Sequence, residues 1–223
     1  MSRPYKGCLF DLDGTLIRST SHFDAVWIRW AALHGIDPAP ILATHHGRRM
    51  EDTIRHVTGA RFDAPRTMAE QIDIIITMAA THLDNLTIID GAKEFLHSLP
   101  EDRWAIVTSN HLSLVKSWLD FLALPLPAVI ITADDVSRGK PDPEGYLKAS
   151  AALGFAPQDC LVFEDAPAGI QAAKSAGCGL IIIEGTLTAP EPDAEGWMKD
   201  YRGFGVGLVD LPPFQRTLRL LRF

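Results

Sequence analysis

The sequence predicts an α/β fold: a Rossmann-like parallel sheet core with helices on both faces and an inserted helical cap. Short, wholly apolar runs alternate with amphipathic stretches in the second half of the chain, which is typical of parallel strands covered on both faces. Between the first apolar run and that second half, hydrophobic residues recur at helical spacing instead. With 223 residues, 47% of them hydrophobic, the chain can bury the core of one domain with an insert.

The first strand is predicted at Cys8–Phe10, and a helical unit is predicted after it. An amphipathic stripe at helical spacing is formed by Phe23, Val26, Trp27, Trp30 and Ala31. Further helices are predicted over Met50–Val57, ended by Gly59, and from Thr67 to Leu83. Because no convincing strand is found here, we expect a helical cap at 17–89 and a core formed by 1–16 and 90–223.

The remainder of the chain alternates predicted strands with predicted helices. The strands are expected at Trp104–Thr108, Ala128–Ile131, Cys160–Phe163 and Leu180–Ile183. The helices are expected at Leu112–Phe121, Pro143–Leu153 and Pro167–Ala176, with Asp142 as the N-cap of the second and Gly177 ending the third. After Pro190 the chain is rich in Gly and Pro, and only an edge strand near Val206–Leu208 is expected.

The composition argues against several classes of protein. A net charge of −7 disfavours nucleic acid as a partner, because phosphate backbones require a basic surface. No apolar run approaches the roughly 18 residues of a membrane span, and the N-terminus lacks the apolar region of a signal peptide. The cysteines, Cys8, Cys160 and Cys178, form no C-x-x-C pair and two adjoin apolar runs, which favours free thiols in a reducing cytoplasm.

The first strand runs into two carboxylates and a glycine, Asp11-Leu12-Asp13-Gly14. Side chains alternate along an extended chain, so Asp11 and Asp13 project to the same side, and their mutual repulsion favours a cation beside them. Gly14 allows a sharp turn. The pattern also opens calcium-binding loops, but those need more oxygen ligands downstream, whereas Thr15-Leu16 follows here.

Polar residues follow each of the next predicted strands, and the ends of parallel strands meet at one edge of a sheet. Thr108, Ser109 and Asn110 lie just before a helix and would suit an anion such as phosphate. Lys140 lies in a proline-bounded loop, and Glu164-Asp165 follows the fourth strand. Singly, each could be a helix cap or a surface residue. Together with Asp11 and Asp13 they predict a Mg²⁺ site that binds a phosphate ester.

These motifs resemble those of the haloacid dehalogenase-like hydrolase superfamily, in the subgroup with a helical cap after the first strand. The matching pieces are Asp11-Leu12-Asp13-Gly14-Thr15, Val107-Thr108-Ser109-Asn110, Gly139-Lys140-Pro141-Asp142-Pro143 and Val162-Phe163-Glu164-Asp165-Ala166-Pro167-Ala168-Gly169. The sugar- and polyol-phosphate phosphatases of that group, which act on substrates such as 2-deoxyglucose 6-phosphate and glycerol phosphate, are the nearest in pattern. Ile130–Val136 and His46-Gly47-Arg48-Arg49 are also similar to these enzymes.

The resemblance implies a Mg²⁺-dependent phosphatase that forms an aspartyl phosphate on Asp11. Asp13 would act as general acid and then as general base. Asp11, the Asp13 carbonyl and Asp165 would hold the metal, with Glu164 in its second shell ordering bound water or Lys140. The phosphate would be bound by Thr108, Ser109, Asn110 and Lys140, and the substrate would be read by His46, Gly47, Arg48 and Arg49 of the cap.

Other activities within the resemblance are less well matched. The dehalogenases lack an acid corresponding to Asp13, and the phosphonatases need a cap lysine, whereas 17–92 contains none. Phosphosugar mutases use a cap histidine where Phe23 stands here, with His22 one residue away. A mutase and a catalytically silent binding module therefore remain the alternatives. We expect a cytoplasmic monomer or small homo-oligomer that acts on a small-molecule phosphate ester.

Overall fold

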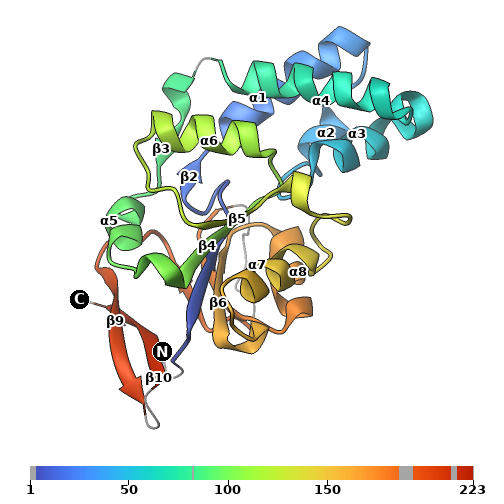
Figure 1. Cartoon of the computed structure of the whole chain (residues 1–223). Coiled ribbons are helices and arrows are strands. Elements are labelled where there is room, and N and C mark those ends of the chain that lie inside the picture. Colours follow the sequence, from blue (N-terminus) through green and yellow to red (C-terminus); the bar gives the residue numbers. More distant parts are fainter. Residues whose placement is uncertain (1–3, 82, 186–192, 212–214, 223) are drawn as a thin grey trace.

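The central feature of the structure is a six-stranded sheet in the order β5-β4-β1-β6-β7-β8 (Figure 1). The computed structural model describes residues 4–81, 83–185, 193–211 and 215–222. The strands are β1 (Gly7–Phe10), β4 (Trp104–Val107), β5 (Val129–Ile131), β6 (Cys160–Glu164), β7 (Gly179–Ile183) and β8 (Gly196–Met198). All neighbouring strands are parallel, which confirms the predicted fold class.

The sheet is covered on both faces, and its central strands β4, β1, β6 and β7 are buried along their whole length. Along β1, Cys8 and Phe10 belong to one hydrophobic cluster and Leu9 to another. Helices α7 (Glu144–Ala152) and α8 (Pro167–Ala176) cover the Leu9 face. The Phe10 face packs against α5 (Ala92–His97), and its cluster continues through α6 (Leu112–Phe121) into the helices inserted after β1.

The insert is mainly helical, as predicted. It contains α1 (Thr20–His34), α2 (Ala39–Leu42), α3 (Met50–Thr58) and α4 (Pro65–Ala79), which lie together above the sheet in Figure 1. Trp27 and Trp30 are buried in it, and the Trp30 indole donates a hydrogen bond of 3.1 Å to Gln71. The expectation of no strand was wrong, because β2 (Ile17–Arg18) pairs with β3 (Thr87–Ile88). Two residues are too few to show an alternating pattern.

The helices of the second half agree closely with the sequence. α6 and α8 have the predicted bounds, and Gly177 follows α8 with a φ of 78°. α7 begins one residue later than expected, with Pro143 at the N-cap position. The prediction of Asp142 as the N-cap was therefore wrong by one residue, although its carboxylate accepts a hydrogen bond of 3.0 Å from the N–H of Glu144, the first helical residue. Short 3₁₀ helices complete the connections: η1 (Gly59–Phe62), η2 (Leu83–Asn85), η3 (Glu101–Arg103), η4 (Ala133–Asp135) and η5 (Pro157–Asp159).

The tail differs from the expectation. The strand expected near Val206 is part of β9 (Phe204–Leu211), but β9 pairs with β10 (Gln215–Arg222) in a separate antiparallel hairpin. One edge of the main sheet is instead β8, whose three residues are too few to show a strand pattern in the sequence. Within the described ranges, no helix combines the length and apolar character that crossing a membrane requires.

Candidate active site

Asp11, Lys140 and Glu164 meet where the central strands end. Asp11 follows β1 directly, and its backbone N–H donates to the Phe163 carbonyl of β6 at 3.0 Å. The Lys140 ammonium donates to Asp11 Oδ1 and to Glu164 Oε1, both at 2.6 Å. The side chains of Lys140 and Asp11 are each 6% exposed and that of Glu164 is not exposed. The strand ends therefore bring together residues that are far apart in the sequence.

Asp11 and the neighbouring Asp165 resist ionisation. Burial, followed by the Glu164 charge, raises the pKa of Asp11 to about 8 even though Lys140 opposes the shift. Burial and the Glu164 charge also raise the pKa of Asp165 well above its ordinary value. Burial acts to lower the pKa of Lys140, but Asp11 and Glu164 outweigh it and the pKa is raised. One ammonium is thus surrounded by more acids than it can neutralise.

The Asp13 carboxylate accepts hydrogen bonds from neighbouring polar side chains. The Ser19 hydroxyl donates to Asp13 Oδ1 at 2.5 Å, and the Asn110 amide donates to Asp13 Oδ2 at 2.6 Å. Burial raises the pKa of Asp13 to about 6, against the opposing hydrogen bonds from Ser19 and Thr108. Ser19 was not singled out from the sequence; its position just before a helix was the available signal.

The structure brings the predicted phosphate-binding residues together, and each of Thr108, Ser109 and Asn110 makes a hydrogen bond to a different partner. Thr108 is buried and its Oγ1 accepts a hydrogen bond of 3.2 Å from the Asn110 N–H. The Asn110 side chain contacts Asp13, as described, and the Ser109 hydroxyl donates to the Gly47 carbonyl of the insert at 2.8 Å. The side chains of Ser109 and Asn110 therefore link the site to its neighbours in this structure.

Glu164 is fixed by protein donors on both carboxylate oxygens. Besides Lys140, its Oε1 accepts a hydrogen bond of 2.9 Å from the Tyr146 hydroxyl. Its Oε2 accepts from the backbone N–H groups of Asp165 and Ala166 at 2.9 and 3.0 Å. Tyr146 was missed in the sequence, where it is simply an apolar helix position. Fully engaged oxygens suit Glu164 to hold Lys140 rather than to bind a metal directly.

The donor set fits a hard divalent cation. Oxygens of Asp11 and Asp165 lie within 4.8 Å of each other, beside Glu164, whose own oxygens are already engaged. Carboxylate oxygens are the ligands that Mg²⁺ prefers. The space beside the Asp165 carboxylate is kept open by glycine, because a Cβ at Gly14 or Gly185 would collide with it. Gly14 also has a φ of 80°, which disfavours any other residue.

A cleft between the strand ends and the insert opens onto Asp11, Asp13 and Asp165. The space within it, including the open mouth, is about 540 Å³. The insert contributes polar and apolar lining residues: Ser19, Thr20, Phe23, Trp27, His45, His46, Gly47, Arg48 and Met50.

The cleft wall includes two adjacent histidines. His45 is buried and its Nε2 lies 2.8 Å from Asp24 Oδ1. Burial, followed by the nearby His46, lowers the pKa of His45 to about 4, and burial also lowers the pKa of His46. Both rings are therefore neutral at pH 7 and can donate and accept hydrogen bonds.

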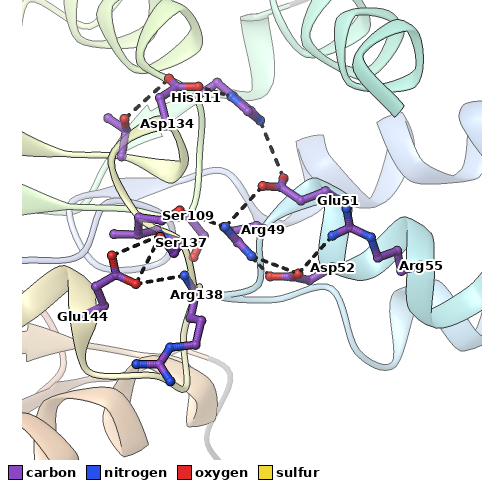
Figure 2. A network of polar contacts seen from close by, with 12 residues as sticks. Arg49, Glu51, Asp52, Arg55, Ser109, His111, Asp134, Ser137, Arg138 and Glu144 are labelled. Carbon is purple, nitrogen blue, oxygen red and sulfur yellow. Dashed lines mark hydrogen bonds and ion pairs between the residues drawn. The ribbon is translucent and has the colours of Figure 1, made fainter. Parts of the chain in front are cut away.

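Arg49 lies outside the cleft that His46, Gly47 and Arg48 line. Its guanidinium donates to the Asp52 carboxylate and to the Val136 carbonyl, and it does not line the cleft (Figure 2). Arg48, by contrast, is exposed and does line it.

Comparison with known proteins identifies the family. The sequence profile described as haloacid dehalogenase-like hydrolase matches residues 5–177. The chain belongs to the haloacid dehalogenase-like hydrolase family. This hydrolase is 37% identical over 187 residues to hexitol phosphatase A of Escherichia coli (strain K12), covering 83% of this chain and 86% of the relative.

Two further comparisons agree with this assignment. 2-Deoxyglucose-6-phosphate phosphatase 2 of Saccharomyces cerevisiae is 36% identical to this hydrolase over 191 residues, covering 76% of each chain. The crystal structure of a hydrolase from Pseudomonas syringae superposes with a TM-score of 0.74 at 23% identity, over 87% of this chain and 94% of the other. That structural likeness supports the fold alone. Because relatives of this similarity are named as phosphatases of hexitol, 2-deoxyglucose 6-phosphate and glycerol 1-phosphate, this hydrolase is a phosphoric monoester hydrolase.

Proposed function

We propose that this hydrolase is a Mg²⁺-dependent phosphatase that acts on a small phosphorylated sugar, polyol or related metabolite through an aspartyl phosphate on Asp11. The observation that carries the proposal is the buried Lys140–Asp11 contact of 2.6 Å beside Asp13. The relatives named for hexitol and 2-deoxyglucose-6-phosphate support the substrate class.

Asp11 would act as the nucleophile that attacks phosphorus, and Asp13 would act as the general acid and then as the general base. Attack by the Asp11 carboxylate divides one difficult displacement into two easier ones. Asp13 would protonate the leaving alcohol and then deprotonate the water that attacks the phosphorylated Asp11. A pKa of about 6 suits a group that must give and then take a proton near neutral pH. Ser19 and Asn110 would keep its carboxylate aimed at the cleft.

The transferring phosphoryl oxygens would be bound by positive charge and N–H groups. Asp11, the Asp13 carbonyl and Asp165 would hold Mg²⁺, with Glu164 ordering Lys140 in the second shell. When bound, the cation would offset the negative charge shared by the nucleophile and the phosphate. Lys140 and Thr108 would bind the phosphoryl oxygens, together with the backbone N–H groups of Ser109 and Asn110.

Residues 17–89 would act as the cap that selects the substrate. His46, Gly47 and Arg48 line the cleft opposite the acids and would contact the leaving alcohol. Neutral His46 can exchange hydrogen bonds with hydroxyl groups, and Arg48 adds a positive charge for polar or anionic groups. Closure of this cap would exclude water during phosphoryl transfer.

The mutase alternative is disfavoured by the position of His22. Its ring is buried against Trp118, and Nε2 lies 2.8 Å from the Ala79 carbonyl. His22 does not line the cleft, so it has no access to a sugar hydroxyl there.

A phosphate-ester panel tests the proposal. Hexitol, hexose, deoxyhexose and glycerol phosphates would be incubated with the native protein and with Asp11→Asn, with Mg²⁺ and with EDTA. We expect phosphate release that needs Mg²⁺ and is abolished in Asp11→Asn. Normal turnover by Asp11→Asn would exclude Asp11 as the nucleophile. No release from any ester would favour the silent binding module.

A further inference from the structure

A short segment of the insert, Gly47–Glu51, contacts the loops that follow three strands of the sheet. Its first residue accepts the hydrogen bond from Ser109, after β4. A Cβ at Gly47 would lie 3.1 Å from Cβ of Ala166, after β6. Its last residue, Glu51, lies 3.8 Å from His111 of the loop after β4. Arg49 reaches the loop after β5, which carries Lys140.

The Arg49 guanidinium is oriented by its own helix. Its Nε and Nη2 donate to the two oxygens of Asp52 at 2.8 and 3.1 Å, and Nη1 lies 3.5 Å from Glu51 Oε1. A two-point contact of this kind fixes the plane of the guanidinium. Nη1 then points across to the core, where it donates to the Val136 carbonyl at 3.1 Å. The residue is 8% exposed, so this contact is shielded from water.

The loop 136–140 is held from its core side by Glu144. The Glu144 carboxylate accepts hydrogen bonds from the N–H groups of Ser137 and Arg138 at 2.9 to 3.1 Å (Figure 2). A hydrogen bond from Lys148, followed by these N–H groups, lowers the pKa of Glu144 to about 2. The carboxylate is therefore charged at any working pH, and this side of the loop is fixed from within the core.

Arg49 holds the same loop from the opposite side. A Cβ placed on Gly139 would lie 2.7 Å from Arg49 Nε and 2.8 Å from its Cγ. The arginine side chain therefore rests directly on the backbone of the residue before Lys140. Only glycine leaves room for that approach.

We propose that Arg49 is a positioning residue for Lys140. The Arg49 guanidinium, which belongs to the cap, and Glu144 of the core contact the 136–140 loop from its two sides. Because this loop carries Lys140, its ammonium is held firmly against Asp11 only while the cap is closed. The inference rests on the proposed function, because it assigns Lys140 to the phosphoryl group and 17–89 to a moving cap. It explains why Arg49 lies outside the cleft although it is next to Arg48, which lines it.

The test compares three variants of the full-length protein by hydrogen–deuterium exchange and by steady-state kinetics. Arg49→Ala removes the guanidinium, and Arg49→Lys keeps the charge but not the two-point contact. Arg55→Ala is the matched control, since Arg55 is a cation of α3 whose ion pairs, with Asp52 at 3.8 Å and Asp63 at 3.2 Å, lie within the insert. Thermal unfolding confirms that each variant is folded.

For Arg49→Ala we expect faster exchange in peptides that cover 136–142. We also expect kcat to fall about 10²-fold, the cost of a small misplacement of a catalytic group, with KM little changed. Arg49→Lys should recover part of both effects, added guanidinium ion should raise the activity of Arg49→Ala, and Arg55→Ala should match the native protein.

Unchanged exchange over 136–142 in a folded Arg49→Ala would overturn the proposal, and so would equal effects of Arg55→Ala. Exchange does not depend on turnover. Faster exchange in a protein that hydrolyses no phosphate ester would therefore count against the proposed function while supporting the role of Arg49 in the loop.

Discussion

The ammonium of Lys140 lies 2.6 Å from the Asp11 carboxylate and also 2.6 Å from that of Glu164. All three groups are almost fully buried. One ammonium thus contacts two buried carboxyl groups. Burial of these ionisable groups is tolerated because each has a partner.

Lys140→Met should destabilise the protein by about 3–5 kcal/mol, the cost of leaving a buried charge without its partner. The double variant Lys140→Met with Glu164→Gln should recover part of the loss, because one of the stranded carboxylates is then neutral. Urea unfolding at pH 7.5 in EDTA measures both. If Lys140→Met alone were as stable as the native protein, the Lys140 ammonium would not be stabilising these buried acids.

The metal-free protein should lose stability as the pH rises toward 8. Asp11 has an ordinary pKa of 3.8 and a folded pKa of about 8, so the folded state binds more protons than the unfolded state between these values. The free energy of unfolding therefore falls with rising pH across that window. Mg²⁺ should offset the loss, so the gain in Tm on adding Mg²⁺ should be larger at pH 8 than at pH 5.5.

Asp165→Asn serves as the control for that measurement. It removes one expected ligand and should remove most of the Mg²⁺-dependent gain in Tm. An equal gain in this variant would place the cation elsewhere.

Asp13→Asn should lower kcat by about 10²–10⁴-fold, the usual contribution of general acid and base catalysis. Asparagine keeps the shape of the side chain and can still accept the hydrogen bond from Ser19. The loss in kcat/KM should be smaller for an aryl phosphate with a good leaving group, which needs less protonation, than for an alkyl phosphate. The same loss for both esters would count against Asp13 as the general acid.

His111→Gln should reveal a pH-dependent contribution to stability. Burial acts to lower the pKa of His111, but Glu51 and Asp134, at 3.8 and 2.6 Å, outweigh it and raise the pKa above 6.5. Because the pKa of His111 is higher in the folded than in the unfolded protein, its protonation stabilises the fold. This stabilisation is fully present below pH 6.5 and is lost as the pH rises through the folded pKa. The difference in unfolding free energy between native protein and variant should therefore shrink from pH 6 to pH 9. A difference that is constant over this range would exclude the ion pairs.

The sequence predicted those parts of the fold that depend on local pattern. α6 and α8 match the predicted bounds because their apolar stripes and flanking glycine or polar residues are read locally. The two-residue strands β2 and β3 and the short edge strand β8 were missed, because so few residues carry no periodicity. Their pairing is set by tertiary contacts.

The acids and the lysine of the site could be placed from the sequence, because consecutive parallel strands end at one edge. The contacts of the insert could not. Arg48 and Arg49 are neighbours of the same type, yet one lines the cleft and the other holds the Lys140 loop. The different positions of Arg48 and Arg49 depend on the backbone turn at Gly47, which has a φ of 74°, and on the packing of the insert against the core.

The position of β1 in the sheet has a consequence for synthesis of the chain. Its hydrogen-bonded neighbours begin at Trp104 and Cys160, so the segment ending in Asp11 leaves the ribosome long before either is made. Until β4 and β6 are made, β1 has no partner strands and its apolar side chains stay exposed. Exposed apolar segments make nascent chains prone to aggregate. Asp11 is therefore made well before Lys140 and Glu164, and its buried surroundings form only after both have been translated.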